Sequence, residues 1–417
     1  MVNYQPRVVD SLLRRKLQTI GAVLIEGPKL CGKSTTATMQ AKSVLFMEPG
    51  RTLQIAALNP KLLLEGDVPR LIDEWQLAPQ LWDAIRREVD RREGIPGQFI
   101  LTGSAVPADK SGIMHTGTGR FGWLKMRPMT LFESKESNGS VSLGALFDGD
   151  LNIACTSSLS LENVAFAACR GGWPTALRQT GELALAHAFD YFDAIVREDI
   201  SRVDGTRRNQ ETTRKLLRSY ARVQGSQISL SEIAKDVGQQ ASEKTIGTYL
   251  TALRQIFVVE DMPAWNPNLR SKTAIRTSDT RYFIDPSIAT AALGVGPRDL
   301  LLNPETFGFI FETLCMRDLR VYAEALDGSV SHFRDKNGLE CDAVLHRRDG
   351  RYGLIEIKLG SEKGIDDGVK TLTTFSKKID TDAMRSPSFL MILTASGDFA
   401  YRRDDGILVV PIGCLKP

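Results

Sequence analysis

The sequence predicts an α/β protein whose first domain contains a mostly parallel sheet. The apolar run GAVLIEG (21–27) is typical of a buried strand that ends in a turn. A helical stretch, STTATMQAKS (34–43), and a second apolar run, VLFME (44–48), follow directly. This order of strand, loop, helix and strand predicts a mostly parallel sheet, because two parallel strands need a crossover connection.

Further elements fit the same pattern. Residues 8–20 carry apolar side chains at helical spacing and predict a helix before the first strand. RLIDEW (70–75) and QFILTGS (98–104) predict later strands, with a helix at 81–92 between them. Residues 105–120 are rich in Gly, Ser and Thr and predict a long loop.

The remainder of the chain changes character twice. Residues 134–160 have a linker-like composition, and a helical segment follows through about residue 205. The pattern from 210 to 257 is helical with breaks at Gly225 and Gly238, and after Gly294 helix and strand patterns alternate. We therefore expect three domains, at 1–150, 151–294 and 295–417.

Composition sets broad limits on the function. Hydrophobic residues make up 42% of the 417 positions and charged residues 25%, as in ordinary globular proteins. The net charge of +3 does not by itself indicate a nucleic-acid partner. The six cysteines lie far apart without a CxxC pair, which predicts reduced thiols and no zinc site. Without a signal peptide or an apolar run of about 18 residues, we expect a cytoplasmic protein that does not enter a membrane.

One glycine-rich loop predicts a nucleotide site. Residues 27–34, GPKLCGKS, fit the pattern G-x-x-x-x-G-K-[ST] between a strand and a helix. In this pattern the backbone N–H groups surround phosphates, the lysine neutralises the β and γ phosphates, and the serine hydroxyl binds Mg²⁺. We therefore expect ATP and Mg²⁺ as cofactors. The predicted cofactor-binding residues are Gly27, Pro28, Lys29, Leu30, Cys31, Gly32, Lys33, Ser34 and Thr35.

Hydrolysis also requires an acidic strand end that holds the metal and orients water. Asp73 and Glu74 follow the apolar residues Leu71 and Ile72 and supply such an end. Asp73 would then join Ser34 as a metal ligand, and Glu74 would act as general base. The alternative is a solvated acidic pair that begins the next helix.

The strand at 98–104 ends in small polar residues. In a parallel sheet that end faces the ligand crevice, so Thr102 or Ser104 is a candidate sensor of the γ phosphate. A plain strand-to-loop turn explains the same residues.

The ordered set of motifs resembles a known family. DEWQ (73–76), FILTGS (99–104) and GRFGWLKMRPMTLFE (119–133) are similar to the AAA+ ATPases of bacteria and archaea that carry a C-terminal domain of unknown function. GGWP (171–174) and YFID (282–285) resemble two further motifs of that family. Arg120 is our candidate for a charge-stabilising arginine, in cis or across a subunit boundary. A structural arginine in a turn is the alternative.

The helices at 212–257 resemble a winged helix-turn-helix. Lys244, Thr245, Thr248 and Arg254 form the polar face of the third helix, which could enter a major groove. Basic residues on the first helix could contact phosphates; they are Arg214, Lys215, Arg218 and Arg222. The alternative is a helical region that only packs against the nucleotide domain.

The last domain carries a set of charged residues typical of a nuclease. Glu356 and Lys358 occupy alternate positions of the strand LIEIKLG, so they project to one face. With Glu312 and Asp342, three carboxylates could hold Mg²⁺ while Lys358 positions water or stabilises phosphate charge. The pattern E…D…E-x-K resembles the restriction-endonuclease-like fold, also called PD-(D/E)xK. A decayed nuclease fold that only binds DNA or a partner is the alternative.

Together these features predict an ATPase. The predicted catalytic residues are Lys33, Glu74, Arg120, Glu356 and Lys358, and the predicted metal ligands are Ser34, Asp73, Glu312, Asp342 and Glu356. Hydrolysis would be coupled to DNA binding or processing, in a protein that could form homo-oligomers. The alternative is an ATP-dependent regulatory switch that binds a protein partner and has an inactive nuclease-like domain.

Overall fold

The computed structural model describes residues 4–104, 116–238, 241–265, 278–382 and 384–417. The chain forms two compact units. The first contains Met1–Pro128, Ala194–Gln210 and Thr248–Val258, and the second contains Met129–Asp193, Glu211–Gly247 and Val259–Pro417. Each is described by itself.

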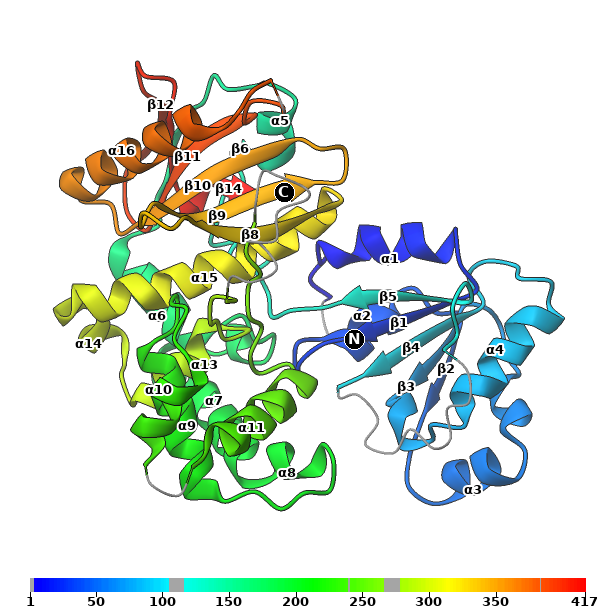
Figure 1. Cartoon of the computed structure of the whole chain (residues 1–417). Coiled ribbons are helices and arrows are strands. Elements are labelled where there is room, and N and C mark those ends of the chain that lie inside the picture. Colours follow the sequence, from blue (N-terminus) through cyan, green and yellow to red (C-terminus); the bar gives the residue numbers. More distant parts are fainter. Residues whose placement is uncertain (1–3, 105–115, 239–240, 266–277, 383) are drawn as a thin grey trace. The chain divides into compact units, whose positions relative to one another are not determined.

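The first unit is built on a five-stranded parallel sheet (Figure 1). Its strands run in the order β2-β3-β4-β1-β5, so β1 lies between β4 and β5, and β4 separates it from β3. The strands are β1 (Ala22–Glu26), β2 (Ser43–Phe46), β3 (Arg70–Asp73), β4 (Phe99–Gly103) and β5 (Phe121–Lys125). The helices are α1 (Val9–Leu17), α2 (Lys33–Thr38), α3 (Arg51–Leu58) and α4 (Leu81–Arg91), with 3₁₀ turns η1 (Pro60–Leu64) and η2 (Trp75–Leu77).

Helix α4 covers one face of this sheet. Its residues Leu81, Ile85 and Val89 recur at helical spacing and are buried in one cluster with Leu24 and Phe99. Because side chains alternate along a strand, Val23, Ile25 and Ile100 turn to the other face and are also buried. Both faces of the sheet are thus apolar, and the polar residues that follow the strands collect at the carboxyl edge.

The predicted parallel sheet is confirmed, with two differences of detail. The helix predicted at 34–43 ends at Thr38, because its three threonines lose side-chain freedom in a helix. The Thr38 hydroxyl also bonds to the carbonyl of Ser34, 2.7 Å away. Strand β5 was not predicted, since its sequence FGWLK follows directly on the loop assigned to 105–120; residues 105–115 lie outside the described part of the chain.

The second unit begins with short elements and continues as helices. Its first elements are β6 (Val141–Ser142), α5 (Leu143–Phe147) and β7 (Ala154–Thr156). The helices that follow are α6 (Leu161–Arg170), α7 (Gly181–Ala194), α9 (Gln210–Arg222), α10 (Leu230–Val237), α13 (Pro286–Leu293) and α14 (Pro297–Leu302), with the turn η3 (Ala176–Arg178). The first unit also includes three helical pieces from this part of the chain. They are the π-helical turn η4 (Ile195–Asp199), helix α8 (Ile200–Arg202) and the second half of α11 (Glu243–Gln255).

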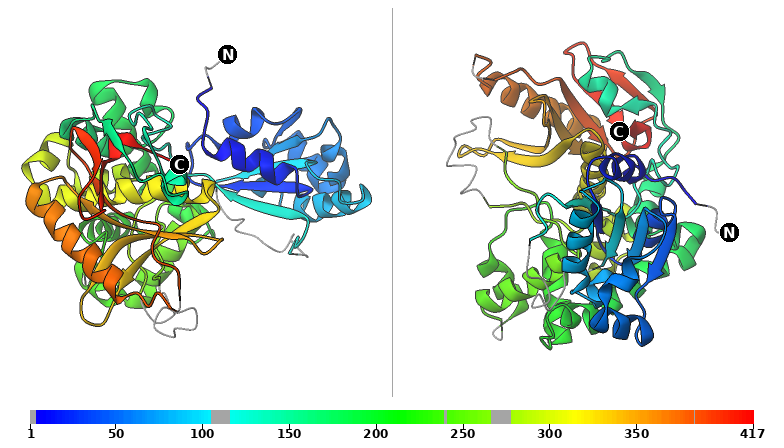
Figure 2. Two further views of the ribbon diagram at one scale, coloured as in Figure 1. Left: turned by 90° about the horizontal axis from the view of Figure 1, so that it is seen from above. Right: turned by 90° about the vertical axis from the view of Figure 1, so that its right-hand side faces the viewer.

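A seven-stranded mixed sheet forms the C-terminal part of the second unit, and Figure 2 gives two further views of it. Its order is β7-β12-β13-β11-β10-β9-β8, with β8, β9 and β10 antiparallel in turn and β10, β11 and β13 parallel. Helices α15 (Pro304–Ala325) and α16 (Glu362–Lys378) pack on it. The strands are β8 (Gly328–Arg334), β9 (Glu340–Arg347), β10 (Tyr352–Lys358), β11 (Phe389–Thr394), β12 (Phe399–Arg402) and β13 (Leu408–Pro411); β14 (Leu415–Lys416) pairs with β6, after the turn η5 (Ile412–Cys414).

A buried arginine on α15 connects distant segments of the second unit. Arg317 is 2% exposed, and its guanidinium lies 3.0 Å from Asp285 and 2.8 Å from Asp318. Asp285 also accepts the N–H of Gly172 at 3.0 Å, and Asp318 accepts that of Leu131 at 2.9 Å. The motifs at 119–133, 171–174 and 282–285 therefore share one hydrogen-bond network, which gives them a structural role.

The predicted domain boundaries do not coincide with those of the compact units. The segment 129–150, which the sequence placed in the first domain, belongs to the second unit. The regions predicted at 151–294 and 295–417 share most of one unit, because Arg317 of α15 joins the segments on both sides of residue 294. Among the described residues, no helix combines the length and the apolar character needed to span a bilayer.

Candidate functional site

The loop between β1 and α2 lies at the carboxyl edge of the parallel sheet. Leu30 has φ 64° and Gly32 has φ 100°, so the loop contains two left-handed residues within three positions. Gly27 has φ 154° and lies against the carbonyl of Met126; an added Cβ would be 2.0 Å from that oxygen. Glycine at 27 is therefore required by close backbone approach.

The Lys33 side chain folds back over the loop that precedes it. Its ammonium donates to the carbonyls of Gly27 at 2.9 Å and Pro28 at 2.7 Å, and the residue is 5% exposed. Phosphate oxygens could replace these two carbonyls as acceptors, because a buried ammonium needs hydrogen-bond partners both with and without a bound nucleotide.

The remaining loop residues divide between surface and interior. Leu30 and Thr35 are exposed, whereas Cys31 is fully buried with its thiol 3.5 Å from the carbonyl of Met126. The ammonium of Lys29 lies 2.5 Å from Asp199. Cys31 therefore anchors the loop, while the exposed residues form its outer surface.

The acidic end of β3 reaches the start of α2. The Ser34 hydroxyl donates to Asp73 Oδ1 at 2.7 Å, and the Thr102 hydroxyl of β4 donates to the same oxygen. The register of the sheet explains the second contact, because Asp73 pairs with Thr102. Ser34 and Asp73 thus present oxygen atoms to one point, and hydroxyl and carboxylate oxygens are the ligands that Mg²⁺ prefers.

Glu74 projects differently from its neighbour Asp73. Its backbone is left-handed, with φ 57°, an uncommon conformation for a residue other than glycine. Gln76 Nε2 donates to Glu74 Oε2, and the Ser104 hydroxyl lies 3.3 Å from the same oxygen. The sequence alone indicated no role for Gln76, although this residue is the last of the DEWQ motif (73–76).

Arg120 does not lie near the loop within its own domain. It precedes β5, and its carbonyl accepts the N–H of Ala22 at the start of β1. Parallel strands place this point at the amino edge of the sheet, about 17 Å from the loop at about 3.3 Å per residue of β1. Its guanidinium lies 2.8 Å from Asp90. A cis contact with a phosphate therefore does not fit this position, and a contact across a subunit boundary stays a prediction.

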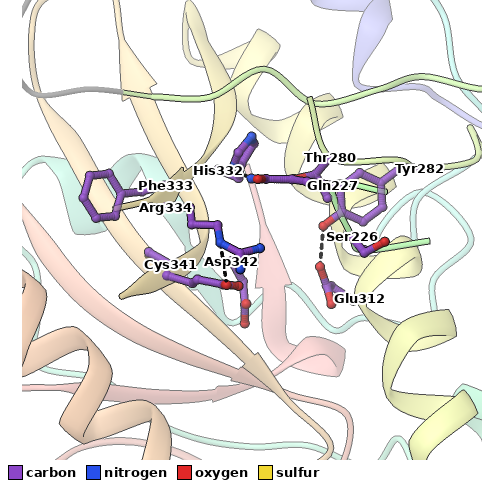
Figure 3. A pocket seen from close by; sticks show the side chains of 12 residues that line it. Ser226, Gln227, Thr280, Tyr282, Glu312, His332, Phe333, Arg334, Cys341 and Asp342 are labelled. Carbon is purple, nitrogen blue, oxygen red and sulfur yellow. Dashed lines mark hydrogen bonds and ion pairs between the residues drawn. The ribbon is translucent and has the colours of Figure 1, made fainter. Parts of the chain in front are cut away.

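The four charged residues of the C-terminal part occupy one region of the second unit. Lys358 Nζ on β10 lies 2.7 Å from Glu356 and 3.3 Å from Asp342 of β9. On α15, Glu312 accepts a hydrogen bond from the Tyr282 hydroxyl (Figure 3). Burial, with the negative charge of Asp342, raises the pKa of Glu312 to about 8 and that of Glu356 to about 8. Burial lowers the pKa of Lys358, but the two carboxylates more than offset it and raise the pKa overall.

Glu312 and Asp342 also line a small cavity of about 40 Å³ (Figure 3). Nevertheless, in the part of the chain that the structure describes, no three or more His, Cys, Asp and Glu side chains are grouped so as to hold a metal ion. The contacts give a physical reason, because the Lys358 ammonium already binds Glu356 and Asp342, and the Tyr282 hydroxyl binds Glu312. The predicted three-carboxylate site is therefore not formed as the side chains stand.

Three family models match successive parts of the chain. An AAA domain model matches residues 20–135, a domain of unknown function (DUF8612) matches 161–299, and another (DUF4143) matches 307–415. Residues 20–135 are therefore similar to an AAA domain. This match covers the sheet, the loop and the acidic strand end of the first unit.

Curated relatives and solved structures give more distant similarity. Two uncharacterized proteins, from Mycobacterium tuberculosis and Mycobacterium bovis, are each 24% identical over 409 residues, covering 96% of this chain and 82% of the relative. A Walker-type ATPase of Pyrococcus abyssi is 14% identical with a TM-score of 0.42, covering 69% of this chain and 96% of that one. The RuvB Holliday junction branch migration motor of Thermotoga maritima is 18% identical with a TM-score of 0.28, covering 61% and 89%.

Proposed function

We propose that the AAA-type domain binds ATP with Mg²⁺ and hydrolyses it. The observation that carries this proposal is the 2.7 Å contact between Ser34 and Asp73, which joins the phosphate loop to the acidic strand end. Lys33 would exchange the carbonyls of Gly27 and Pro28 for β- and γ-phosphate oxygens. Ser34 and Asp73 would hold the magnesium ion, which screens phosphate charge when bound.

Glu74 is the proposed general base for the attacking water. Asp73 is occupied by the hydroxyls of Ser34 and Thr102, whereas Glu74 is turned away from them by its left-handed backbone. Gln76 and Ser104 then fix the direction of its carboxylate. Two adjacent carboxylates thereby obtain different partners, which suits one of them to a metal and the other to a proton.

The middle helices are proposed to bind DNA. The capping box at Ser229 begins α10, and α11 follows it with Lys244 and Thr248 exposed. After α11, Val259 bridges Phe283 and Met262 bridges Thr280 in antiparallel fashion, as the wing of a winged helix would. These features support α11 as the helix that enters a major groove.

The basic residues of α9 support this proposal less well than α11 does. Arg214 lies 2.7 Å from Asp193, Lys215 lies 2.9 Å from Glu211, and Arg222 pairs with Asp236. Exposed pairs of this kind contribute little to stability, but a phosphate would have to compete with each carboxylate. We therefore assign the main DNA contact to α11.

The C-terminal part has two candidate roles. In favour of a nuclease-like fold, α15 is followed by three antiparallel strands, β8 to β10, and α16 then connects β10 to the parallel strand β11. In favour of an inactive domain, Lys358 binds both Asp342 and Glu356, and Tyr282 binds Glu312. The second arrangement supports the alternative function, an ATP-dependent switch that acts on a protein partner.

Phosphate release with and without duplex DNA distinguishes the two functions. Wild-type protein with ATP and Mg²⁺ should release phosphate, and the Lys33→Ala variant should not. Acceleration by DNA supports coupling to DNA, whereas the same rate without DNA supports the switch. If wild type and Lys33→Ala bind ATP equally in calorimetry, the assignment of the site is wrong.

A plasmid assay separates the two roles of the C-terminal part. Wild type and Glu356→Ala are incubated with supercoiled plasmid and Mg²⁺ or Mn²⁺. Nicking by wild type alone supports a nuclease. Equal nicking by both proteins indicates contamination, and no nicking by either supports the inactive domain.

A further inference from the structure

An arginine that precedes the first helix reaches the phosphate loop. Arg7 is 7% exposed, and one guanidinium nitrogen donates to the carbonyl of Cys31 at 2.8 Å. The other terminal nitrogen donates to the carbonyl of Arg127, also at 2.8 Å. Cys31 belongs to the loop after β1, and Arg127 follows β5, so Arg7 connects the loop to the neighbouring strand end.

The position of this contact determines where a loop amide points. The carbonyl of Cys31 and the N–H of Gly32 belong to one peptide group, which is planar and trans. These two groups therefore point in opposite directions. Because the Arg7 guanidinium binds the carbonyl of Cys31, the N–H of Gly32 points away from Arg7.

The conformation of the loop makes this restraint necessary. Gly32 has φ 100° and Leu30 has φ 64°, so the peptide groups on either side of Cys31 join residues of unusual conformation. Glycine adopts positive and negative φ with similar ease, so the Cys31–Gly32 peptide can rotate if nothing binds its carbonyl. Successive backbone N–H groups in such alternating conformations form an anion-binding concavity.

The N-terminal segment holds Arg7 firmly in place. The backbone N–H of Arg7 donates to Asp10 Oδ2 at 2.8 Å, and the Tyr4 hydroxyl donates to Asp10 Oδ1 at 2.6 Å. The Tyr4 hydroxyl also lies 3.1 Å from the Thr36 hydroxyl of α2. Two independent contacts therefore connect residues 4–10 to the loop and to the helix that follows it.

We propose that Arg7 is a positioning residue of the nucleotide site, which orients the Gly32 amide toward the phosphates of a bound nucleoside di- or triphosphate. Its fixed positive charge also lies within hydrogen-bond distance of the loop, where it would favour the negative charge of the phosphates. This inference rests on the proposed ATP site. It adds a residue that the phosphate-loop motif does not contain, since Arg7 precedes Gly27 by a helix and a strand.

Two variants test the role of Arg7. Arg7→Met removes the charge and both hydrogen bonds, and Arg7→Lys keeps the charge without the forked donors. Arg14→Met is the matched control, because Arg14 is an exposed arginine on α1. Dissociation constants for ADP and ATP are measured by calorimetry, kcat and KM by phosphate release, and the unfolding temperature by calorimetric scanning.

We expect Arg7→Met to weaken ADP and ATP binding about tenfold or more, the factor that corresponds to one charge-assisted hydrogen bond. Arg7→Lys should weaken it by a smaller factor, and Arg14→Met should match wild type. KM for ATP should rise more than kcat falls, because the oriented amide binds the phosphates in both ground and transition states.

The outcomes separate this inference from the proposed function. If wild type binds no nucleotide, the proposed function fails. If wild type binds ATP and Lys33→Ala does not, but the Arg7 variants bind as wild type does, only the inference on Arg7 is wrong. A lower unfolding temperature with unchanged dissociation constants also overturns it, because it would show a structural role alone. Should Arg7→Met fail to fold, Arg7→Lys carries the same test.

Discussion

The Ser34 hydroxyl lies 2.7 Å from Asp73 Oδ1, although the two residues are separated by 39 positions in the chain. They meet because β1 and β3 are parallel and only β4 lies between them. Both strands therefore end at the same edge of the sheet, where the loop after β1 turns toward the acid at the end of β3. This contact is the geometric basis for the predictions on hydrolysis.

Glu74→Gln should separate binding from hydrolysis. The amide keeps the shape of the side chain but cannot accept a proton from water, so kcat should fall by about 10²–10⁴. The dissociation constant for ATP should change little, because Lys33, Ser34 and the loop amides remain. Glu48→Gln, at an exposed carboxylate in the same domain, is the control. Equal turnover in wild type and Glu74→Gln would show that another group is the base.

Gln76→Leu should reduce turnover without weakening substrate binding. Gln76 Nε2 donates to the carboxylate of Glu74, and leucine removes this donor at similar size. We expect kcat to fall about tenfold with KM for ATP nearly unchanged, because the base then adopts several directions. Steady-state phosphate release measures both constants. An increased kcat would indicate instead that Gln76 restrains Glu74 in an inactive position.

Arg317→Met should strongly destabilise the second unit. The change leaves the buried carboxylates of Asp285 and Asp318 without their cation, a loss of about 3–5 kcal/mol in typical cases. Denaturant unfolding measures the free energy, with Arg218→Met at an exposed site of α9 as the control. A loss below about 1 kcal/mol would contradict the structural role of this network.

The stability of the second unit should fall as the pH rises from 6 to 9. Burial raises the pKa of Glu312 to about 8, above its ordinary value of 4.5, so the folded state keeps a proton that the unfolded chain releases. This contribution is complete below the unfolded pKa and is lost as the pH rises through the folded pKa. For one proton, the free energy of unfolding falls by about 1.4 kcal/mol per pH unit between the two pKa values.

Glu312→Gln provides the control for this pH dependence. The glutamine cannot ionise, so its variant should lose stability less steeply between pH 6 and 9. Denaturant titrations at several pH values give the free energy of unfolding of both proteins, and hence its slope against pH for each. Parallel slopes in wild type and variant would show that Glu312 is ionised in the folded protein throughout this range.

Lys244→Ala should weaken DNA binding more than Arg222→Ala. Lys244 is exposed on α11, whereas Arg222 already pairs with Asp236. Removal of one phosphate contact should also lower the slope of log K against log salt concentration by about one. Binding of a labelled duplex at several salt concentrations tests this. Equal effects of both substitutions would argue against α11 as the helix that binds DNA.

Some of the site could be predicted from short stretches of sequence. The strand, glycine loop and helix at 21–38 form a local unit, so the pattern GPKLCGKS already implied the position of Lys33. Asp73 could be placed at a strand end for the same reason, because the apolar residues Leu71 and Ile72 precede it. Local hydrophobic patterning and turn chemistry decide such features.

Other relationships depend on residues far apart in the chain. No periodic pattern in the sequence indicates that Arg7 contacts Cys31. The same holds for the hydrogen bond between Tyr282 and Glu312. The cis role considered for Arg120 failed because the direction of β5 places this residue at the opposite edge of the sheet. Strand direction and sheet order are decided by tertiary packing.

The sequence by itself determined the parallel α/β architecture of the first domain and the glycine loop between its first strand and helix, because both follow from apolar periodicity and glycine spacing within a few dozen residues. Only the tertiary structure decided which side chains meet. The Lys358 ammonium, for instance, binds both Asp342 and Glu356, although the sequence suggested three carboxylates around a metal. Charge balance in a buried site depends on distances among groups from different elements, and a linear pattern contains no such distances.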